Sequence, residues 1–138
     1  MISKALDYAM RSMVYMTAQG DNTYFGVKEL AEKIQVSSTY LGKVLQSLVK
    51  SGYLKSTTGP GGGFALARDP ETIKLIELIE CVDGSRLREK CILGLTECSE
   101  ANPCPIHETW KSCRSQLTDD LSETSLAQVI GKSWPQYR

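Results

Sequence analysis

The chain has 138 residues, 41% apolar content and no net charge, which fits a single domain of ordinary size. The sequence contains no apolar run of about 18 residues, so a membrane-spanning helix is not expected. Its opening residues also lack the apolar stretch and cleavage site of a signal peptide. We therefore expect a cytoplasmic protein with no membrane partner.

Charge is divided unevenly along the chain. Residues 1–68 carry eight Lys/Arg and four Asp/Glu, whereas residues 69–138 carry eight Lys/Arg and twelve Asp/Glu. A basic half joined to an acidic half favours one module that contacts an anionic polymer and a second that does not. Chance fluctuation is the alternative explanation.

The first half of the chain alternates helical and strand patterns. Apolar residues recur at helical spacing over residues 2–18, 27–34 and 38–51, and strand-forming residues fill 53–58 and 64–67. A short connection separates the second and third helices, and a glycine-rich turn separates the two strands. This order predicts a helix-turn-helix followed by a β-wing. Tyr24 and Phe25 are expected to add a short strand.

The second half is also expected to be helical. Asp69, Pro70 and Glu71 form a helix-start pattern, and the helix is predicted to run to Val82. Further helices are predicted over residues 105–121 and 125–130. We therefore expect a mainly α fold with a small β-wing, in which a winged helix-turn-helix is followed by a long helix.

The predicted boundaries divide the chain into three parts. Residues 1–82 form the DNA-binding domain with its following helix, residues 83–104 form a cysteine loop without clear periodicity, and residues 105–138 form the long helix and the C-terminal tail.

The third predicted helix is the candidate DNA-reading element. The second helix of a helix-turn-helix lies in the major groove, and its N-terminal residues face the base edges. Those residues here are Ser37, Ser38, Thr39, Tyr40 and Lys43. Hydroxyl groups and a lysine can bind bases or phosphates, although Ser37 or Ser38 is also expected to cap the helix.

The glycine-rich turn is the second candidate contact. It lacks the Lys-Ser/Thr of a P-loop, and a strand rather than a helix follows it, so it does not match a nucleotide-binding loop. A wing tip lying along the minor groove explains it better, because glycine lets a backbone approach closely. The candidate residues are Thr58, Gly59, Pro60 and Gly61, and an ordinary hairpin turn is the alternative.

A cluster of soft ligands occupies the loop before the long helix. Cys91, Cys98 and Cys104 precede His107, the only histidine of the chain. Zinc sites usually contain closely spaced cysteine pairs, whereas a larger iron–sulfur cluster suits ligands that stand further apart. An iron–sulfur cluster is therefore favoured over zinc, and three free thiols are the remaining alternative.

The two other cysteines lie outside this loop. Cys81 and Cys113 lie among apolar residues on predicted helices and are expected to pack there. A Cys–His nucleophile would need a third, orienting residue, and no such residue is identifiable. We expect a protein that is not an enzyme.

Several stretches resemble the Rrf family of bacterial winged-helix regulators, also called the IscR/NsrR group. The stretch Leu6–Arg11 is similar to the first helix of the family, and Ser38–Leu41 resembles the start of its recognition helix. The stretch Ser56–Phe64 looks like its wing and is the most specific of the matches. The three loop cysteines also stand where cluster-binding members place theirs.

The resemblance implies a partner and a cofactor. It implies a homodimer whose long helices cross, bound to a palindromic operator in double-stranded DNA. It also implies an iron–sulfur cluster whose state alters DNA affinity in response to iron, oxygen, nitric oxide or redox change. A [2Fe–2S] cluster is favoured, with [4Fe–4S] as the alternative.

Three positions depart from the family pattern. Six residues separate Cys91 from Cys98, where the better-known members have five. Thr58 stands where many members carry an arginine in the wing, and Gly42 stands where some carry an acidic base-reading residue. The loop geometry and the operator are therefore expected to differ from theirs.

The family implies two candidates for the fourth cluster ligand. His107 matches the histidine of the cluster-biogenesis regulator, and Asp7 matches the aspartate that nitric-oxide-sensing members donate from the other subunit. His107 is favoured because it is the softer ligand and lies in the same loop. Asp7 has alternative roles in the helix dipole and in an ion pair with Arg11.

Two other functions remain as alternatives. The first is a cluster-free regulator of the same family that responds to a metabolite or a partner protein. The second is a zinc-stabilised module whose helix-turn-helix contacts only protein.

Overall fold

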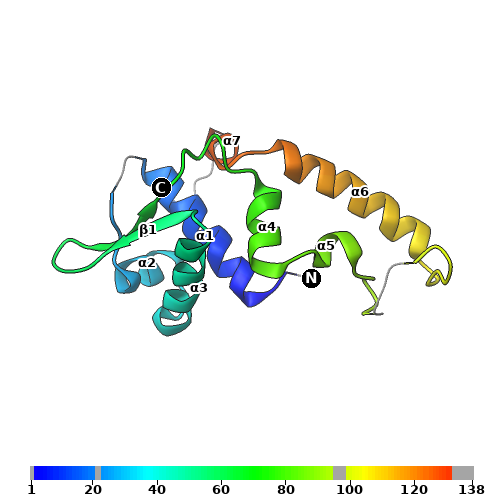
Figure 1. The fold of residues 1–138 in the computed structure, drawn as a ribbon, viewed down its shortest axis with the longest axis horizontal. Coiled ribbons are helices and arrows are strands. Elements are labelled where there is room, and N and C mark those ends of the chain that lie inside the picture. The colour runs from blue at the N-terminus through cyan, green and yellow to red at the C-terminus, as the bar shows by residue number, and fades with distance from the viewer. Residues whose placement is uncertain (1, 21–22, 95–98, 132–138) are drawn as a thin grey trace.

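The computed structural model describes residues 2–20, 23–94 and 99–131. In chain order they form α1 (Lys4–Gln19), α2 (Val27–Ile34), α3 (Ser38–Lys50), β1 (Leu54–Thr57), β2 (Gly63–Leu66), α4 (Leu75–Asp83), α5 (Arg86–Glu89), α6 (His107–Glu123) and α7 (Leu126–Gly131). The wing tip and the N-terminal end of α6 lie at opposite ends of the molecule (Figure 1). The predicted fold class, mainly α with a small β-wing, is confirmed.

The helix-turn-helix consists of α2 and α3, which pack on α1. A tight turn joins them at Gln35, whose backbone is left-handed, with a φ of 60°. The turn closes when the Val36 N–H donates to the carbonyl of Ala31 at 2.9 Å. Because the turn is short and rigid, the start of α3 is fixed relative to the other two helices.

The wing is an antiparallel hairpin of β1 and β2, in which Leu54 pairs with Leu66 and Thr57 with Gly63. Phe25 adds a third, one-residue strand, since it exchanges two backbone hydrogen bonds of 2.8 Å with Phe64. This confirms in part the short strand predicted at Tyr24 and Phe25. The bridge ties the base of the wing to the start of α2.

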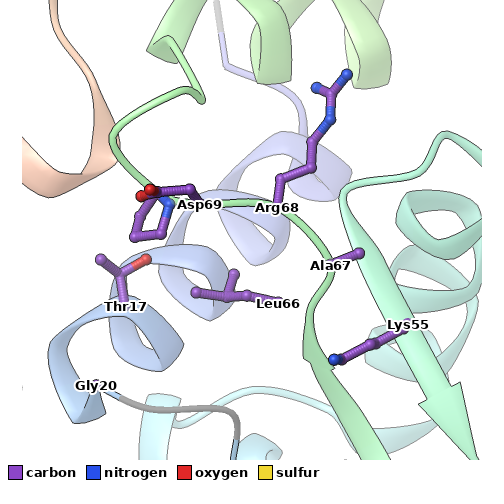
Figure 2. Close-up of a pocket in the computed structure, with 8 residues that line it drawn as sticks. Thr17, Gly20, Lys55, Leu66, Ala67, Arg68 and Asp69 are labelled. Atoms are coloured by element: carbon purple, nitrogen blue, oxygen red, sulfur yellow. The ribbon is translucent and has the colours of Figure 1, made fainter.

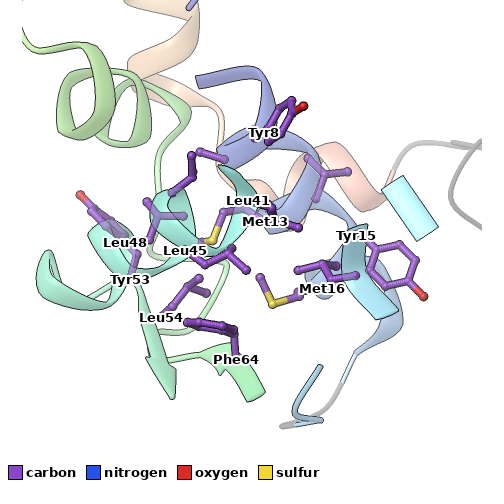
Figure 3. Close-up of a cluster of buried hydrophobic side chains, with 14 of the residues drawn as sticks. Tyr8, Met13, Tyr15, Met16, Leu41, Leu45, Leu48, Tyr53, Leu54 and Phe64 are labelled. Atoms are coloured by element: carbon purple, nitrogen blue, oxygen red, sulfur yellow. The ribbon is translucent and has the colours of Figure 1, made fainter. Parts of the chain in front are cut away.

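One apolar core holds the helices and the wing together. It takes one stripe from each of the three N-terminal helices and adds residues from the wing; among its members are Met13, Met16, Leu30, Leu41, Leu45, Leu48, Leu54 and Phe64. Figure 3 shows Leu41, Leu45 and Leu48 of α3 directed into this core. The opposite face of α3 is left for solvent. Within the described ranges no helix has the length and apolar content needed to cross a membrane.

The start of α4 differs from the prediction. Asp69 caps a separate turn, in which its carboxylate accepts from the Glu71 N–H at 2.9 Å, and the helix begins only at Leu75. Ile73 and Lys74, between that turn and the helix, are extended, because the Leu75 N–H donates to the Thr124 carbonyl and the Leu126 N–H donates to the Ile73 carbonyl. Pairing with the segment that leads into α7 therefore overrides the helix-start signal at Pro70.

Helices α5 and α6, together with the loop between them, form what we call the arm. Helix α6 packs against α4 and α5, and it extends away from α1, α2, α3 and the wing, which we call the head (Figure 1). It spans His107–Glu123 where residues 105–121 were predicted. The short helix α5 was not predicted, because its sequence has no clear period.

Candidate nucleic-acid interface and cysteine loop

A groove runs along the outer face of α3 and has a volume of about 610 Å³. Six of its lining residues come from α3, and Val27 of α2 and Phe64 of the wing complete it; the six are Thr39, Gly42, Lys43, Gln46, Ser47 and Lys50. Two of the lining residues are lysines and none is acidic. This groove can therefore receive a polyanion without placing a carboxylate against it.

The predicted reading residues lie at the start of α3. Ser37, Thr39 and Lys43 are exposed, whereas Ser38 and Tyr40 are half-buried. Ser37 occupies the cap position, yet its hydroxyl makes no capping hydrogen bond, and the expectation that Ser37 or Ser38 caps the helix through its side chain is not met at this position. The first helical bond instead runs from the Leu41 N–H to the Ser37 carbonyl.

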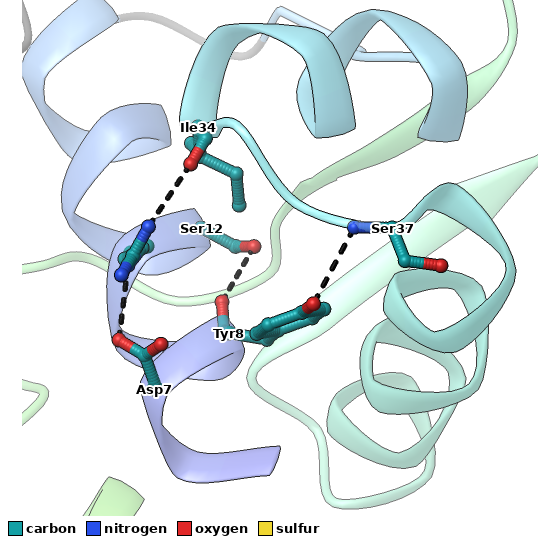
Figure 4. A network of polar contacts seen from close by, with 6 residues as sticks. Asp7, Tyr8, Ser12, Ile34 and Ser37 are labelled. Carbon is teal, nitrogen blue, oxygen red and sulfur yellow. Dashed lines mark hydrogen bonds and ion pairs between the residues drawn. The ribbon is translucent and has the colours of Figure 1, made fainter. Parts of the chain in front are cut away.

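Two tyrosines hold the start of α3 against α1. The rings of Tyr8 and Tyr40 meet edge to face at 5.3 Å between centroids. The Tyr8 hydroxyl accepts a 3.4 Å hydrogen bond from the Ser37 N–H (Figure 4), and the Lys4 ammonium lies 4.8 Å from the centre of the Tyr40 ring. Tyr40 therefore positions the start of the helix.

The wing candidates are placed at the far end of the hairpin. Thr58, Gly59, Pro60 and Gly61 are all exposed. Gly59 and Gly61 have φ values of 87° and 75°, a backbone conformation that residues with a side chain rarely adopt. The tip is thus built from residues that keep its backbone accessible.

Sequence reasoning missed the C-terminal half of the groove. Gln46, Ser47 and Lys50 line it together with the predicted Thr39 and Lys43. The signal was present, because residues 39, 43, 46 and 50 follow the helical period on the face opposite the buried leucines. The prediction covered only the N-terminal turns of the helix, residues 37–43.

A second pocket, of about 260 Å³, lies between the end of α1 and the base of the wing (Figure 2). Its charged groups are already engaged. Arg68 lies 4.8 Å from the centre of the Tyr53 ring and forms a 3.6 Å ion pair with Glu77. Burial raises the pKa of the Tyr53 phenol above its ordinary value, and the Glu77 carboxylate and Cys81 add to the rise. We assign these side chains a packing role.

Asp7 lies on α1 in a polar network of the head. Its carboxylate accepts from the Arg11 Nε at 2.9 Å, and the Arg11 guanidinium also donates to the Ile34 carbonyl at 3.2 Å (Figure 4). The Ile34 carbonyl belongs to the last turn of α2, where a cation is favourable. The alternative ion pair foreseen for Asp7 is therefore present within the chain.

The cysteine loop brings two of its thiols together. The Sγ atoms of Cys91 and Cys104 lie 3.6 Å apart, a non-bonded distance, since a disulfide measures about 2.05 Å. The His107 side chain is buried, and the His107 backbone N–H donates to the Cys104 carbonyl at 3.0 Å. The Trp110 indole donates to the Lys90 carbonyl at 3.0 Å and thereby fixes α6 beside Cys91. Cys98 lies outside the described residues.

This arrangement fits a thiolate-bound metal centre. Two thiolates on one tetrahedral zinc, with bonds of about 2.3 Å, would place their sulfurs about 3.8 Å apart, close to the spacing of Cys91 and Cys104. Within the described ranges, however, no group of three or more side chains is already arranged as a metal site. The fit thus extends to the two sulfurs of Cys91 and Cys104.

The two remaining cysteines differ from each other. Cys81 is half-buried and packs against the core, as predicted. Cys113 is exposed, so the expectation that it packs is wrong for the single chain. It lies on α6 on the same exposed side of the helix as Leu117, whereas Trp110 of the same helix is buried.

Relatives and solved structures agree with this fold. A putative HTH-type transcriptional regulator of Aquifex aeolicus is 32% identical over 93% of this chain and 90% of its own length. The HTH-type transcriptional regulator IscR of Vibrio vulnificus is 29% identical over 89% of this chain and 73% of its own length.

Two solved structures share the fold at lower identity. CymR, the global cysteine regulator of B. subtilis, has a TM-score of 0.80 at 21% identity, covering 97% of this chain and 98% of its own. T. potens IscR has a TM-score of 0.71 at 23% identity, covering 95% and 86%. A family model described as "Rrf2: Iron-dependent Transcriptional regulator" matches residues 2–132. The chain therefore belongs to the Rrf2 family, whose members are transcriptional regulators and not enzymes.

Proposed function

We propose that the chain is a DNA-binding regulator that inserts α3 into the major groove and lays the wing tip beside the minor groove. The groove along α3 carries this proposal, because its lining includes Lys43 and Lys50 and no carboxylate. An α-helix fits the major groove, which is about 12 Å wide. The exposed glycines of the wing tip support the second contact.

The salt dependence of binding tests the DNA contact. Each phosphate that a lysine neutralises adds about one unit to the slope of log affinity against log salt. We expect Lys43→Ala to weaken binding to any duplex and to reduce that slope by about one for each bound subunit. Lys111→Ala, on α6, is the matched control and should leave the slope unchanged. A wild-type protein without a salt slope would favour the zinc-stabilised protein-contact module.

We also propose that Cys91, Cys98 and Cys104 hold an iron–sulfur cluster, with [2Fe–2S] favoured over [4Fe–4S]. The 3.6 Å spacing of the Cys91 and Cys104 sulfurs supports a shared metal centre. Such a cluster, when bound, supplies iron that oxygen, nitric oxide or a redox change can alter. The residues of this chain supply the thiolates, and α5 and α6 hold two of them side by side.

For the fourth ligand we favour His107 over Asp7. His107 is only 4% exposed and starts α6 three residues after Cys104. The Asp7 side chain is 43% exposed and is paired with Arg11 on α1. Replacing each by alanine, and then both, tests the assignment through iron retention and the absorption spectrum. Loss of iron in Asp7→Ala but not in His107→Ala would reverse it.

Anaerobic purification followed by iron, sulfide and zinc analysis is the first test of the cofactor. A brown protein with nearly equal iron and sulfide supports the cluster. A colourless protein with neither, even after anaerobic reconstitution, supports the cluster-free regulator that answers to a metabolite or partner protein. Zinc without sulfide supports the zinc-stabilised module.

A set of contacts connects the cysteine loop to the reading helix. Arg88 of α5 pairs with Glu80 of α4, and the Ser3 hydroxyl, at the start of α1, donates to Asp83 at the end of α4. Helix α1 then holds the start of α3 through Tyr8. We propose that a change at the loop reaches the DNA along this route.

The functional unit is proposed to be a homodimer on a palindromic operator. Ile106, just before α6, and Leu117 of α6 are 41% and 39% exposed, and a second copy of α6 would cover them. A dimer presents two recognition helices about 34–36 Å apart, one turn of DNA. The division of the chain into residues 1–82, 83–104 and 105–138 also stays a prediction.

A further inference from the structure

Gly42 lies in the middle of the recognition helix, where glycine is unusual. Helix α3 runs from Ser38 to Lys50, so four helical residues precede Gly42 and eight follow it. Glycine is the poorest helix former after proline, because it loses the most backbone freedom on folding. A glycine at this position therefore needs a reason.

The fold does not supply that reason. A Cβ atom built on Gly42 would meet only the Val27 Cγ2, at 3.9 Å, which is ordinary van der Waals contact. Its backbone is not among those with positive φ. Gly63 shows the contrast, because a Cβ there would overlap the Phe25 carbonyl oxygen. Alanine would fit at position 42 without strain, so the glycine serves something outside the folded chain.

The absence of a side chain at Gly42 leaves space in the groove along α3. Gly42 lines it, with Thr39 about one helical turn before it and Gln46 about one turn after it. A side chain on a helix leans toward the turn that precedes it, so Gln46 reaches over the space that Gly42 leaves free. Gln46 is exposed, and its amide has no hydrogen-bond partner in the described part of the chain.

We propose that Gly42 is a close-approach point for duplex DNA and that Gln46 reads an adenine there. This inference rests on the proposed DNA-binding function and adds to it the residues that set sequence preference. A glutamine amide pairs with the N6 and N7 edge of adenine in the major groove. A helix backbone bare of a side chain lets that edge come within reach, and Lys43 on the same face anchors a neighbouring phosphate.

The test begins with a duplex selected by the wild-type protein from a pool with a randomised core of about 20 base pairs, long enough for two half-sites. Gly42→Ala should keep or raise the melting temperature yet bind this duplex at least tenfold more weakly. Gly131→Ala, at the only other glycine within a described helix, is the matched control and should bind like the wild type. Unchanged affinity of Gly42→Ala would overturn the proposal.

Substitutions at Gln46 test the base assignment. Gln46→Ala should lose the preference for adenine at one symmetric pair of positions while keeping the preferences elsewhere. Gln46→Arg should exchange that adenine for guanine, since arginine pairs with the guanine O6 and N7 atoms. A selected duplex whose preferences do not change in either variant would overturn the role of Gln46. A wild-type protein that selects no duplex at all would instead overturn the proposed function.

Discussion

The head and the arm of this chain differ in how completely they bury their apolar side chains and assemble their candidate sites. The head buries its leucines within one chain, and its reading groove is complete on a single copy. The arm leaves Ile106 and Leu117 exposed, and its cysteine loop brings together two thiols of the proposed three. A region that is complete alone can be understood from one chain, whereas the arm is where we propose that a cofactor and a second copy bind.

The largest effect should come from the core of the head. Leu45 is fully buried on α3, and Leu45→Ala would remove its packing and leave a cavity. We expect the free energy of unfolding to fall by about 2–5 kcal/mol. Urea denaturation measures this change. A loss below about 1 kcal/mol would show that the head tolerates cavities and is less tightly packed than its burial indicates.

The wing should show the next largest effect. Gly63 has a φ of 138°, and an added Cβ would overlap the Phe25 carbonyl that bridges to Phe64. We expect Gly63→Ala to cost about 1–3 kcal/mol and to expose the amides of β1 and β2 to exchange. Denaturation together with amide hydrogen exchange measures both. If protection from amide exchange falls evenly over the whole chain, the Phe25–Phe64 bridge does not stabilise the wing locally.

How far the sequence predicted the molecule follows the same division. The helix-turn-helix and wing were predictable because their apolar periods are local and the turn of the wing carries glycine. The start of α4 was not, because Leu75 and Leu126 bond to residues some fifty positions away in sequence, and no local pattern encodes that pairing. Distant pairing also overrode the strong helix signal at Pro70.

The candidate sites divide in a similar way. Thr39 and Lys43 were predicted from their place in the helix-turn-helix, and they line the groove with Gln46 and Lys50, which the same period would have found. The exposure of Cys113 was not predictable from α6 alone, because an apolar stripe does not say whether its partner belongs to the same chain or another copy.

The junction between the two regions should show a moderate effect. The Ser3 hydroxyl accepts from the Leu6 N–H at 3.0 Å as the cap of α1, and it also donates to Asp83 of α4. We expect Ser3→Ala to cost about 1 kcal/mol, as for other lost caps. Ser3→Thr keeps the hydroxyl and should restore stability. If DNA affinity then responds to iron loss equally in all three proteins, the junction does not carry the coupling.

The smallest effect on folding should come from the arm. Leu117 is the counterpart of Leu45 on an exposed helix face, 39% accessible, so the same leucine-to-alanine change removes little buried area. We expect Leu117→Ala to alter the free energy of unfolding of one chain by no more than about 0.5 kcal/mol. The same change should weaken self-association, because a second α6 would bury that side chain. Sedimentation equilibrium separates the two effects, since dissociation depends on protein concentration and unfolding of a monomer does not. A variant that associates like the wild type would place the dimer contact elsewhere on the arm.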